Sequence, residues 1–171
     1  MPRTKKHATK QDAISLLEKD HAKVRALLAE LTESAERATT KRQELLAEIE
    51  RELKIHTTIE EEIFYPAFRD AAEKAEDRKL YYEAVEEHHV VDTVLPELKV
   101  TDIASESFAA KAKVLKDLVE HHAEEEETEM FSRARKLLGR EELVRLGEEL
   151  AKGKVSLTEN VLTKLVELVR P

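Results

Sequence analysis

The sequence predicts an all-α protein: an up-and-down antiparallel four-helix bundle with one or two additional C-terminal helices. The chain of 171 residues contains only 3 Gly and 4 Pro, and it is rich in the Ala, Leu, Glu, Lys and Arg that lose little side-chain freedom in helices. Hydrophobic residues make up 41% of the chain and charged residues 39%. This is enough apolar material for a core, and the length suits a single domain.

Apolar residues recur at helical spacing in four long segments. The first begins after Asp12, which is a suitable N-cap, and Gly139 is placed to close the last as a left-handed cap. The four predicted helices cover residues 12–38, 40–68, 75–98 and 105–138. Two shorter amphipathic segments, 140–152 and 157–170, follow on either side of Gly153. We therefore expect a flexible tail at 1–11, a bundle at 12–139 and a C-terminal helical extension at 140–171 that covers one side or end of it.

Composition excludes several classes of function. The absence of Cys excludes thiolate chemistry, disulfides and iron–sulfur ligation. The net charge of −8 argues against nucleic acid as the main partner, and no apolar run approaches the length of a membrane span. The basic start of the chain lacks the apolar stretch of a secretory signal, so we expect a cytoplasmic protein.

An internal repeat singles out six polar residues in the apolar stripes. The segment DHAKVRALLAEL around His21 matches EHHVVDTVLPEL around His88, and HTTIEEEIFYP from His56 matches HAEEEETEMFS from His122. Where adjacent residues are both candidate ligands, the alignment of the two halves selects one of them. It selects His88 rather than His89, and His122 rather than His121. The aligned set is His21, His56, Glu60, His88, His122 and Glu126.

Such a set predicts a metal site. A His and a Glu four residues apart share one helix face, close enough to bind one ion or to join two through the carboxylate. Buried polar groups of this kind need compensation. Imidazole and carboxylate ligands without thiolate favour iron or manganese. Ligand type alone does not exclude zinc. His7, His89 and His121 are interpreted as ordinary polar residues, and Tyr81 as a packed core tyrosine.

These motifs resemble those of the hemerythrin-like, HHE cation-binding family over about residues 12–139. The motifs are DH at Asp20 and His21, HTTIE followed by FYP from His56, EH at Glu87 and His88, and HAEEE from His122. The resemblance implies an up-and-down four-helix bundle. It also implies two iron ions in a non-heme centre, bridged by two carboxylates and usually by an oxo or hydroxo group.

The sequence departs from the oxygen-carrying members of that family, which have a fifth histidine four residues from another on the third helix. The positions four residues from His88 are Ala84 and Asp92. Tyr65, Asp92 or solvent are candidates for the missing ligand. On a regular helix, however, Tyr65 is nine residues from His56 and points away, so packing is its expected role.

We therefore expect a diiron protein that binds or senses dioxygen, nitric oxide or peroxide. The alternatives are catalase-like peroxide disproportionation and iron storage or handling, and no catalytic residue is assigned. A ferritin-like ferroxidase fits less well, because its bundles use Glu-x-x-His spacing and more carboxylates. We expect a monomer or a weak homodimer.

Overall fold

The computed structural model describes residues 11–169, with side chains to residue 160, and this part of the chain is helical and contains no strand. The predicted tail at 1–11 lies outside the described residues except for Gln11. The helical elements are α1 (Ala13–Glu33), α2 (Thr39–Ile59), η1 (Glu60–Phe64), α3 (Tyr65–Ala71), α4 (Ala75–Lys99), α5 (Glu106–Glu125), η2 (Glu126–Met130), α6 (Phe131–Leu137) and α7 (Gly139–Val169).

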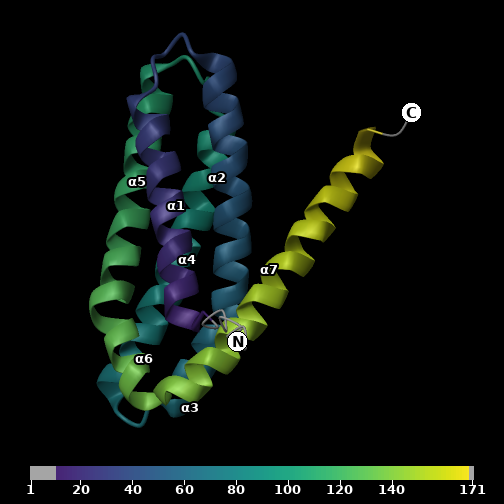
Figure 1. Ribbon diagram of the computed structural model, residues 1–171. Helices are drawn as coiled ribbons and strands as arrows, with labels where there is room; N and C mark the ends of the chain where they lie inside the picture. The colour runs from purple at the N-terminus through teal and green to yellow at the C-terminus, as the bar shows by residue number, and fades with distance from the viewer. Residues whose placement is uncertain (1–10, 170–171) are drawn as a thin grey trace, which may run out of the picture.

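Four long helical columns run side by side and alternate in direction, which confirms the predicted bundle (Figure 1). They are α1, α2 continued through η1 and α3, α4, and α5 continued through η2 and α6. The predicted N-cap is confirmed, because the Asp12 carboxylate accepts a hydrogen bond from the backbone of Ser15 at 2.8 Å. The first helix ends at Glu33, five residues earlier than predicted. There Ser34 caps it, and the buried Arg42 donates to the Ser34 backbone oxygen.

The second and fourth columns each contain one π-helical segment. In η1 the Tyr65 backbone N–H reaches the Glu60 carbonyl, five residues back, and in η2 the Phe131 N–H reaches the Glu126 carbonyl in the same way. Both segments begin at the glutamate of the His-x-x-x-Glu motif. A π segment adds one residue to a helical turn, so side chains beyond it are rotated relative to a regular helix.

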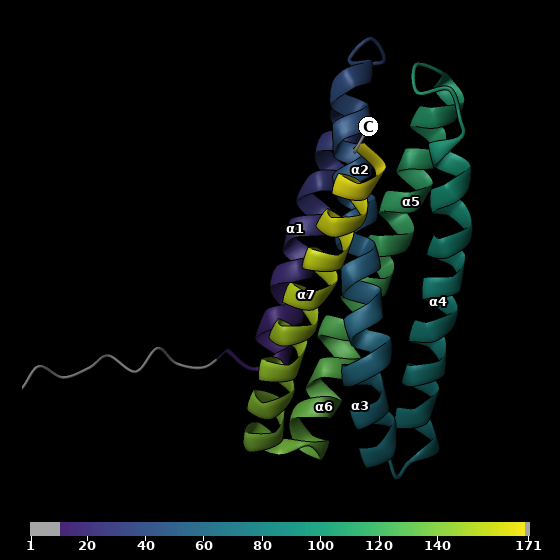
Figure 2. The ribbon, with the colours of Figure 1, turned by 90° about the vertical axis from the view of Figure 1, so that its right-hand side faces the viewer.

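The C-terminal extension is one continuous helix, and the predicted break at Gly153 is wrong. Gly139 does adopt the predicted left-handed conformation, with φ of 72°, and turns the chain into α7. Gly153 lies inside the helix, where it permits a close approach: a Cβ there would lie 3.3 Å from Ile59 and 3.4 Å from Ile63. The helix packs against α1, α2 and η1. Its later part points away from the bundle in Figure 1. In Figure 2, which is turned by 90°, the same part lies in front of α1 and α2.

Two separate apolar clusters fill the bundle. One lies around η1, α3, α6 and α7 and contains Phe64, Phe68 and Phe131, and the other lies toward the α1–α2 and α4–α5 turns and contains Phe108. The six polar residues singled out by the repeat belong to neither cluster, although all of them are buried. In the described part of the chain, no helix has the length and apolar character that crossing a bilayer requires.

Candidate metal centre

The structure brings together all six residues that the repeat selected. His21 lies on α1, His56 on α2, His88 on α4 and His122 on α5, while Glu60 and Glu126 begin the two π segments. Each of the six is at most 6% exposed. Because every helix of the bundle contributes one imidazole at the same level, the centre depends on the whole bundle.

The imidazole Nε2 atoms and the two carboxylates face one another. We call His21 with His56 the first histidine pair, and His88 with His122 the second. In the first pair, Nε2 of His21 lies 3.2 Å from Glu126 and Nε2 of His56 lies 3.2 Å from Glu60. In the second, Nε2 of His88 lies 3.4 Å from Glu60, and Nε2 of His122 lies 3.6 Å from Glu126. Both carboxylates therefore stand between the pairs, as bridging ligands would.

Donor atoms cluster closely enough to hold two cations. One atom each from His21, His56, Glu60 and Glu126 lie within 4.8 Å of one another, and the same holds for Glu60, His88 and His122. Seven buried polar atoms have no hydrogen-bond partner within the described structure: Asp20 Oδ2, His21 Nε2, His56 Nδ1 and Nε2, both Glu60 oxygens and Glu126 Oε2. Unpartnered buried atoms of this kind are costly. Most of them face the space between the pairs, so the donor set fits a bound cation there.

A ring of outer carboxylates orients the imidazoles through their other nitrogen. Nδ1 of His21 lies 2.8 Å from Glu127, Nδ1 of His88 lies 2.7 Å from Glu61, and Nδ1 of His122 lies 2.8 Å from Glu87. Nδ1 of His56 lies 3.7 Å from Asp20. At His21, His88 and His122 the hydrogen-bonded carboxylate on Nδ1 fixes the tautomer that leaves Nε2 free for a metal, and it raises the basicity of the ligand.

Sequence reasoning missed this outer ring, although the repeat contains its signal. Asp20 and Glu87 each precede a histidine, and Glu61 and Glu127 each follow a motif glutamate. Matching positions have matching roles across the repeat: Glu61 contacts the histidine of the other half, as Glu127 does. A run of four glutamates conceals this pattern, because such runs are usually solvated.

Tyr65 points into the centre, contrary to the expected orientation on a regular helix. Its hydroxyl donates to Glu126 at 2.8 Å and lies 3.4 Å from Nε2 of His88. The cause is η1, whose additional residue rotates the side chains beyond it toward the interior. The second candidate, Asp92, is exposed and does not join the centre. His89 and His121 are also exposed, as expected, and His7 lies outside the described residues.

Phe131 occupies the position in the other half of the repeat that matches Tyr65. Its ring stacks on His21 with centroids 5.8 Å apart, as the Tyr65 ring stacks on His88 with centroids 5.5 Å apart. The two halves are thus built alike, but only the half with Tyr65 adds an oxygen donor.

The electrostatics indicate a strained carboxylate pair. Burial and the negative charge of Glu126 raise the pKa of Glu60 well above its ordinary value. Burial also works against a charge on Glu126, yet His122 and His21 hold the pKa of that carboxyl below its ordinary range. Burial lowers the pKa of His56 to about 4, so this imidazole is neutral near pH 7. A bound cation would relieve the repulsion between the two carboxylates.

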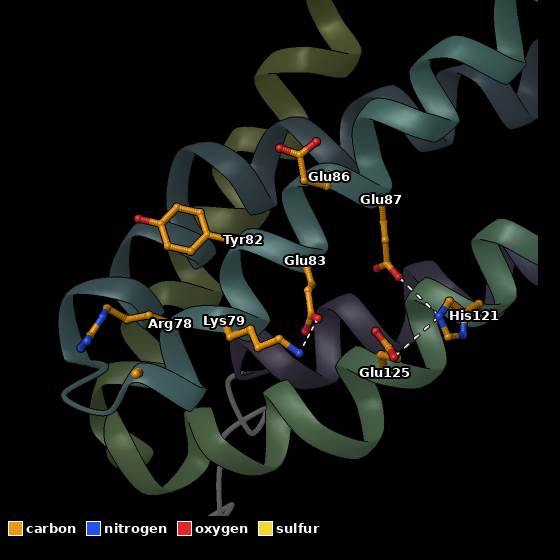
Figure 3. Close-up of a pocket in the computed structure, with 9 residues that line it drawn as sticks. Arg78, Lys79, Tyr82, Glu83, Glu86, Glu87, His121 and Glu125 are labelled. Carbon is orange, nitrogen blue, oxygen red and sulfur yellow. Dashed lines mark ion pairs between the residues drawn. The ribbon is translucent and has the colours of Figure 1, made fainter.

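Two cavities lie beside the centre. A narrow internal one of about 20 Å³ adjoins the four histidines and is otherwise lined by Val24, Leu53, Thr57, Val91, Val119 and Ala123. An open groove of about 620 Å³ runs along the exposed side of α4 and α5 (Figure 3). Glu87 links the groove to the centre: one of its oxygens contacts Nδ1 of His122, and the other lies 3.6 Å from the exposed His121.

Comparisons with known proteins agree with this geometry. The model of the Hemerythrin HHE cation binding domain family matches residues 12–134. A crystal structure of a Hemerythrin HHE cation binding domain-containing protein from Mycobacterium kansasii superposes with a TM-score of 0.80 at 28% identity, covering 94% of this chain and 95% of that one. A DNA nickase from Nostoc sp. is 28% identical over 151 residues, which are 88% of this chain and 40% of that protein.

Proposed function

This chain belongs to the hemerythrin HHE cation-binding family, and from that premise we propose that it holds two non-heme iron ions and binds or senses a small molecule there. The ligands in this proposal are His21, His56, Glu60, His88, His122 and Glu126. Glu60 and Glu126, which face both histidine pairs, would be shared by the two ions, and an oxo or hydroxo group would complete the centre. Tyr65 is a further ligand on the side of the second histidine pair.

The observation that carries the proposal is the orientation of the four imidazoles. Every Nδ1 faces an outer carboxylate, and every Nε2 lies within 3.6 Å of one of the central glutamates. Histidines packed only for stability have no reason to share this arrangement, whereas metal-ligating histidines show it regularly. Imidazole and carboxylate donors around two positions suit iron, and bound iron supplies redox chemistry toward small molecules.

The size and lining of the internal cavity support a small ligand. Its volume of about 20 Å³ has room for about one water-sized molecule. Apolar side chains form most of the wall beside the histidines, which suits dioxygen or nitric oxide. Peroxide is the next candidate, because the Tyr65 hydroxyl and Glu126 stand near the same histidines as groups that exchange a proton.

Two measurements test the proposal. Metal analysis of protein produced with adequate iron should find close to two irons per chain, and a fully folded protein that retains no metal would contradict it. Iron-loaded protein is then assayed for oxygen evolution from peroxide, and the reduced form is exposed to air and to nitric oxide while spectra are recorded. Metal-free protein is the control. A response only to the gases supports a binder or sensor, and oxygen evolution supports catalase-like disproportionation. Inertness in all three assays would leave iron storage or handling.

We do not extend DNA cleavage from the Nostoc relative to this chain. The chain spans 40% of the length of that protein, and its net charge of −8 opposes contact with phosphates. Incubation with supercoiled plasmid and a divalent cation checks this, since conversion to the relaxed form would reverse our interpretation. The cytoplasmic location and the monomer or weak homodimer stay predictions.

A further inference from the structure

The outer carboxylates behind the first histidine pair are themselves paired with cations. Asp20, which faces His56, forms an ion pair with Lys154 of α7. Glu127, which contacts His21, accepts a hydrogen bond from the Arg25 guanidinium at 2.7 Å. Both cations are partly buried, with 28% and 30% of their side chains exposed. Each negative charge behind this pair is therefore offset by a positive one.

The carboxylates behind the second histidine pair lack such partners. Glu61 and Glu87 contact His88 and His122, and no Lys or Arg within residues 11–160 pairs with either of them. Arg25 corresponds to Asp92 in the repeat, so the matching position on α4 is negative. Within residues 11–160, Lys154 has no counterpart behind the second pair, because α7 packs mainly against α1, α2 and η1. Lys79, which lies in the same groove as Glu87, pairs with Glu83 instead (Figure 3).

The two positions share the central glutamates, but not equally: Glu126 belongs to the close donor group of the first position, and its Oε2 lies 3.6 Å from Nε2 of His122 at the second. Two histidines and the shared glutamates face the first position. At the second, Tyr65 adds its hydroxyl 3.4 Å from Nε2 of His88. The outer ring adds a difference in charge. Two carboxylates paired with two cations lie behind the first histidine pair, and two carboxylates without such cations lie behind the second. A divalent cation is attracted more strongly to the second position, because charge interactions in a buried site are weakly screened.

We propose that divalent metal ions fill this centre in a fixed order, first at His88 and His122 and then at His21 and His56, and that Lys154 and Arg25 set the order. The inference rests on the two-ion centre of the proposed function. Lys154 and Arg25 act through Asp20 and Glu127, as positioning residues that touch no metal. Lys154 thereby links the C-terminal helix to the metal centre.

The order is tested by titrating metal-free protein with Co²⁺ at pH 8, followed by calorimetry and visible spectra. We expect a tight step followed by a weaker one. His122→Ala should lose the tight step, and His56→Ala should lose the weak one. The reverse assignment, or the same loss in both variants, would overturn the proposed order.

The role of the two cations is tested by Lys154→Gln and Arg25→Gln. Each removes one positive charge, so the second step should tighten by about tenfold or more while the first changes little. Lys154→Arg keeps the charge and should keep the wild-type difference. Lys99→Gln removes an equal charge that is paired with Glu50 near the end of α4, and it should leave both steps unchanged.

Circular dichroism confirms that each variant is folded, and Arg25 on α1 gives a test that does not depend on the docking of α7. If the wild type binds two ions but neither glutamine variant tightens the second step, the inference fails and the proposed function stands. A wild type that binds fewer than two ions would overturn both.

Discussion

At the scale of single residues, the two halves of the centre differ most at Tyr65 and Phe131. Both rings stack on a histidine, but only Tyr65 presents an oxygen to the metal-binding space. Burial and the neighbouring Glu126 raise the pKa of the Tyr65 phenol well above its ordinary value, so in the metal-free protein it is a proton donor to Glu126. A cation in this space would reverse that preference, as bound metals do for other ligands.

We therefore expect Tyr65→Phe to keep most of the bound iron and to lose a visible charge-transfer band. Phenolate bound to ferric iron gives such a band, and the six remaining ligands still hold the metal. Absorption spectra and iron content of the two proteins are compared. Phe131→Tyr is the matched variant, because it places a hydroxyl at the equivalent position. Identical spectra for wild type and Tyr65→Phe would return Tyr65 to a packing role.

Residue spacing predicted the convergence of the six central side chains because periodicity and the repeat carry that information. Counting along a regular helix placed His21, His56, His88 and His122 inside, where the structure has them. The same counting failed for Tyr65, because a π segment is formed by local backbone hydrogen bonds that residue types alone do not reveal. It also passed over Glu61 and Glu127, whose role appears only when the helices are placed side by side.

At the scale of elements, the close docking of α7 depends on Gly147. A Cβ at this position would lie 2.5 Å from the Gln11 backbone oxygen and 2.8 Å from the Ala13 nitrogen. The N-terminal end of α1 and the surface of α7 are thus in backbone contact. The sequence predicted helices in the extension but not this contact. Gly147 lies within an amphipathic pattern, and that pattern indicates a helix without indicating which position approaches another backbone.

Gly147→Ala should accordingly destabilise the protein by about 1–3 kcal/mol, the usual range for overpacking, since the obstructing atoms belong to the backbone and α7 must shift. Gly153→Ala is the matched control. Its Cβ would meet no backbone atom, only the side-chain methyl groups of Ile59 and Ile63 at 3.3 and 3.4 Å, while alanine favours the helix. Urea unfolding of the metal-free proteins measures both. Equal stability of the two variants would contradict the role given to Gly147.

At the scale of the whole molecule, the six candidate metal ligands form a polar layer between two apolar clusters. All four columns of the bundle contribute to this layer. Its unpartnered buried atoms, Glu60 and His56 prominent among them, oppose folding in the absence of a cation. We therefore expect stability and metal binding to be coupled through the entire bundle.

Removing the metal should lower the unfolding temperature. At a free metal concentration about a hundredfold above the dissociation constant, each site contributes about 2.7 kcal/mol, which corresponds to roughly 5–10 °C for a domain of this size. Differential scanning calorimetry of chelated and reloaded protein measures the difference. The variant His56→Ala is chelated and reloaded in the same way, and we expect metal to raise its unfolding temperature less than that of the wild type. An unchanged unfolding temperature in the wild type would show that the centre does not couple metal to folding.

In the metal-free protein, the contribution of His56 to stability should decrease as the pH falls from about 6.5 toward 4. Burial lowers the pKa of His56 to about 4 in the folded protein, while an unfolded histidine titrates near 6.5, so over this interval protons bind to the unfolded state in preference. Stability from this residue is therefore complete above about pH 6.5 and is lost as the pH approaches 4, a change on the order of 3 kcal/mol.

Glu60 and His122, whose pKa values are raised, act in the opposite direction in both wild type and variant. The comparison is therefore between urea unfolding of metal-free wild type and of His56→Gln at pH 6.5 and 4.5, where the variant should show the smaller decline. Equal declines would mean that His56 is not held neutral by its burial.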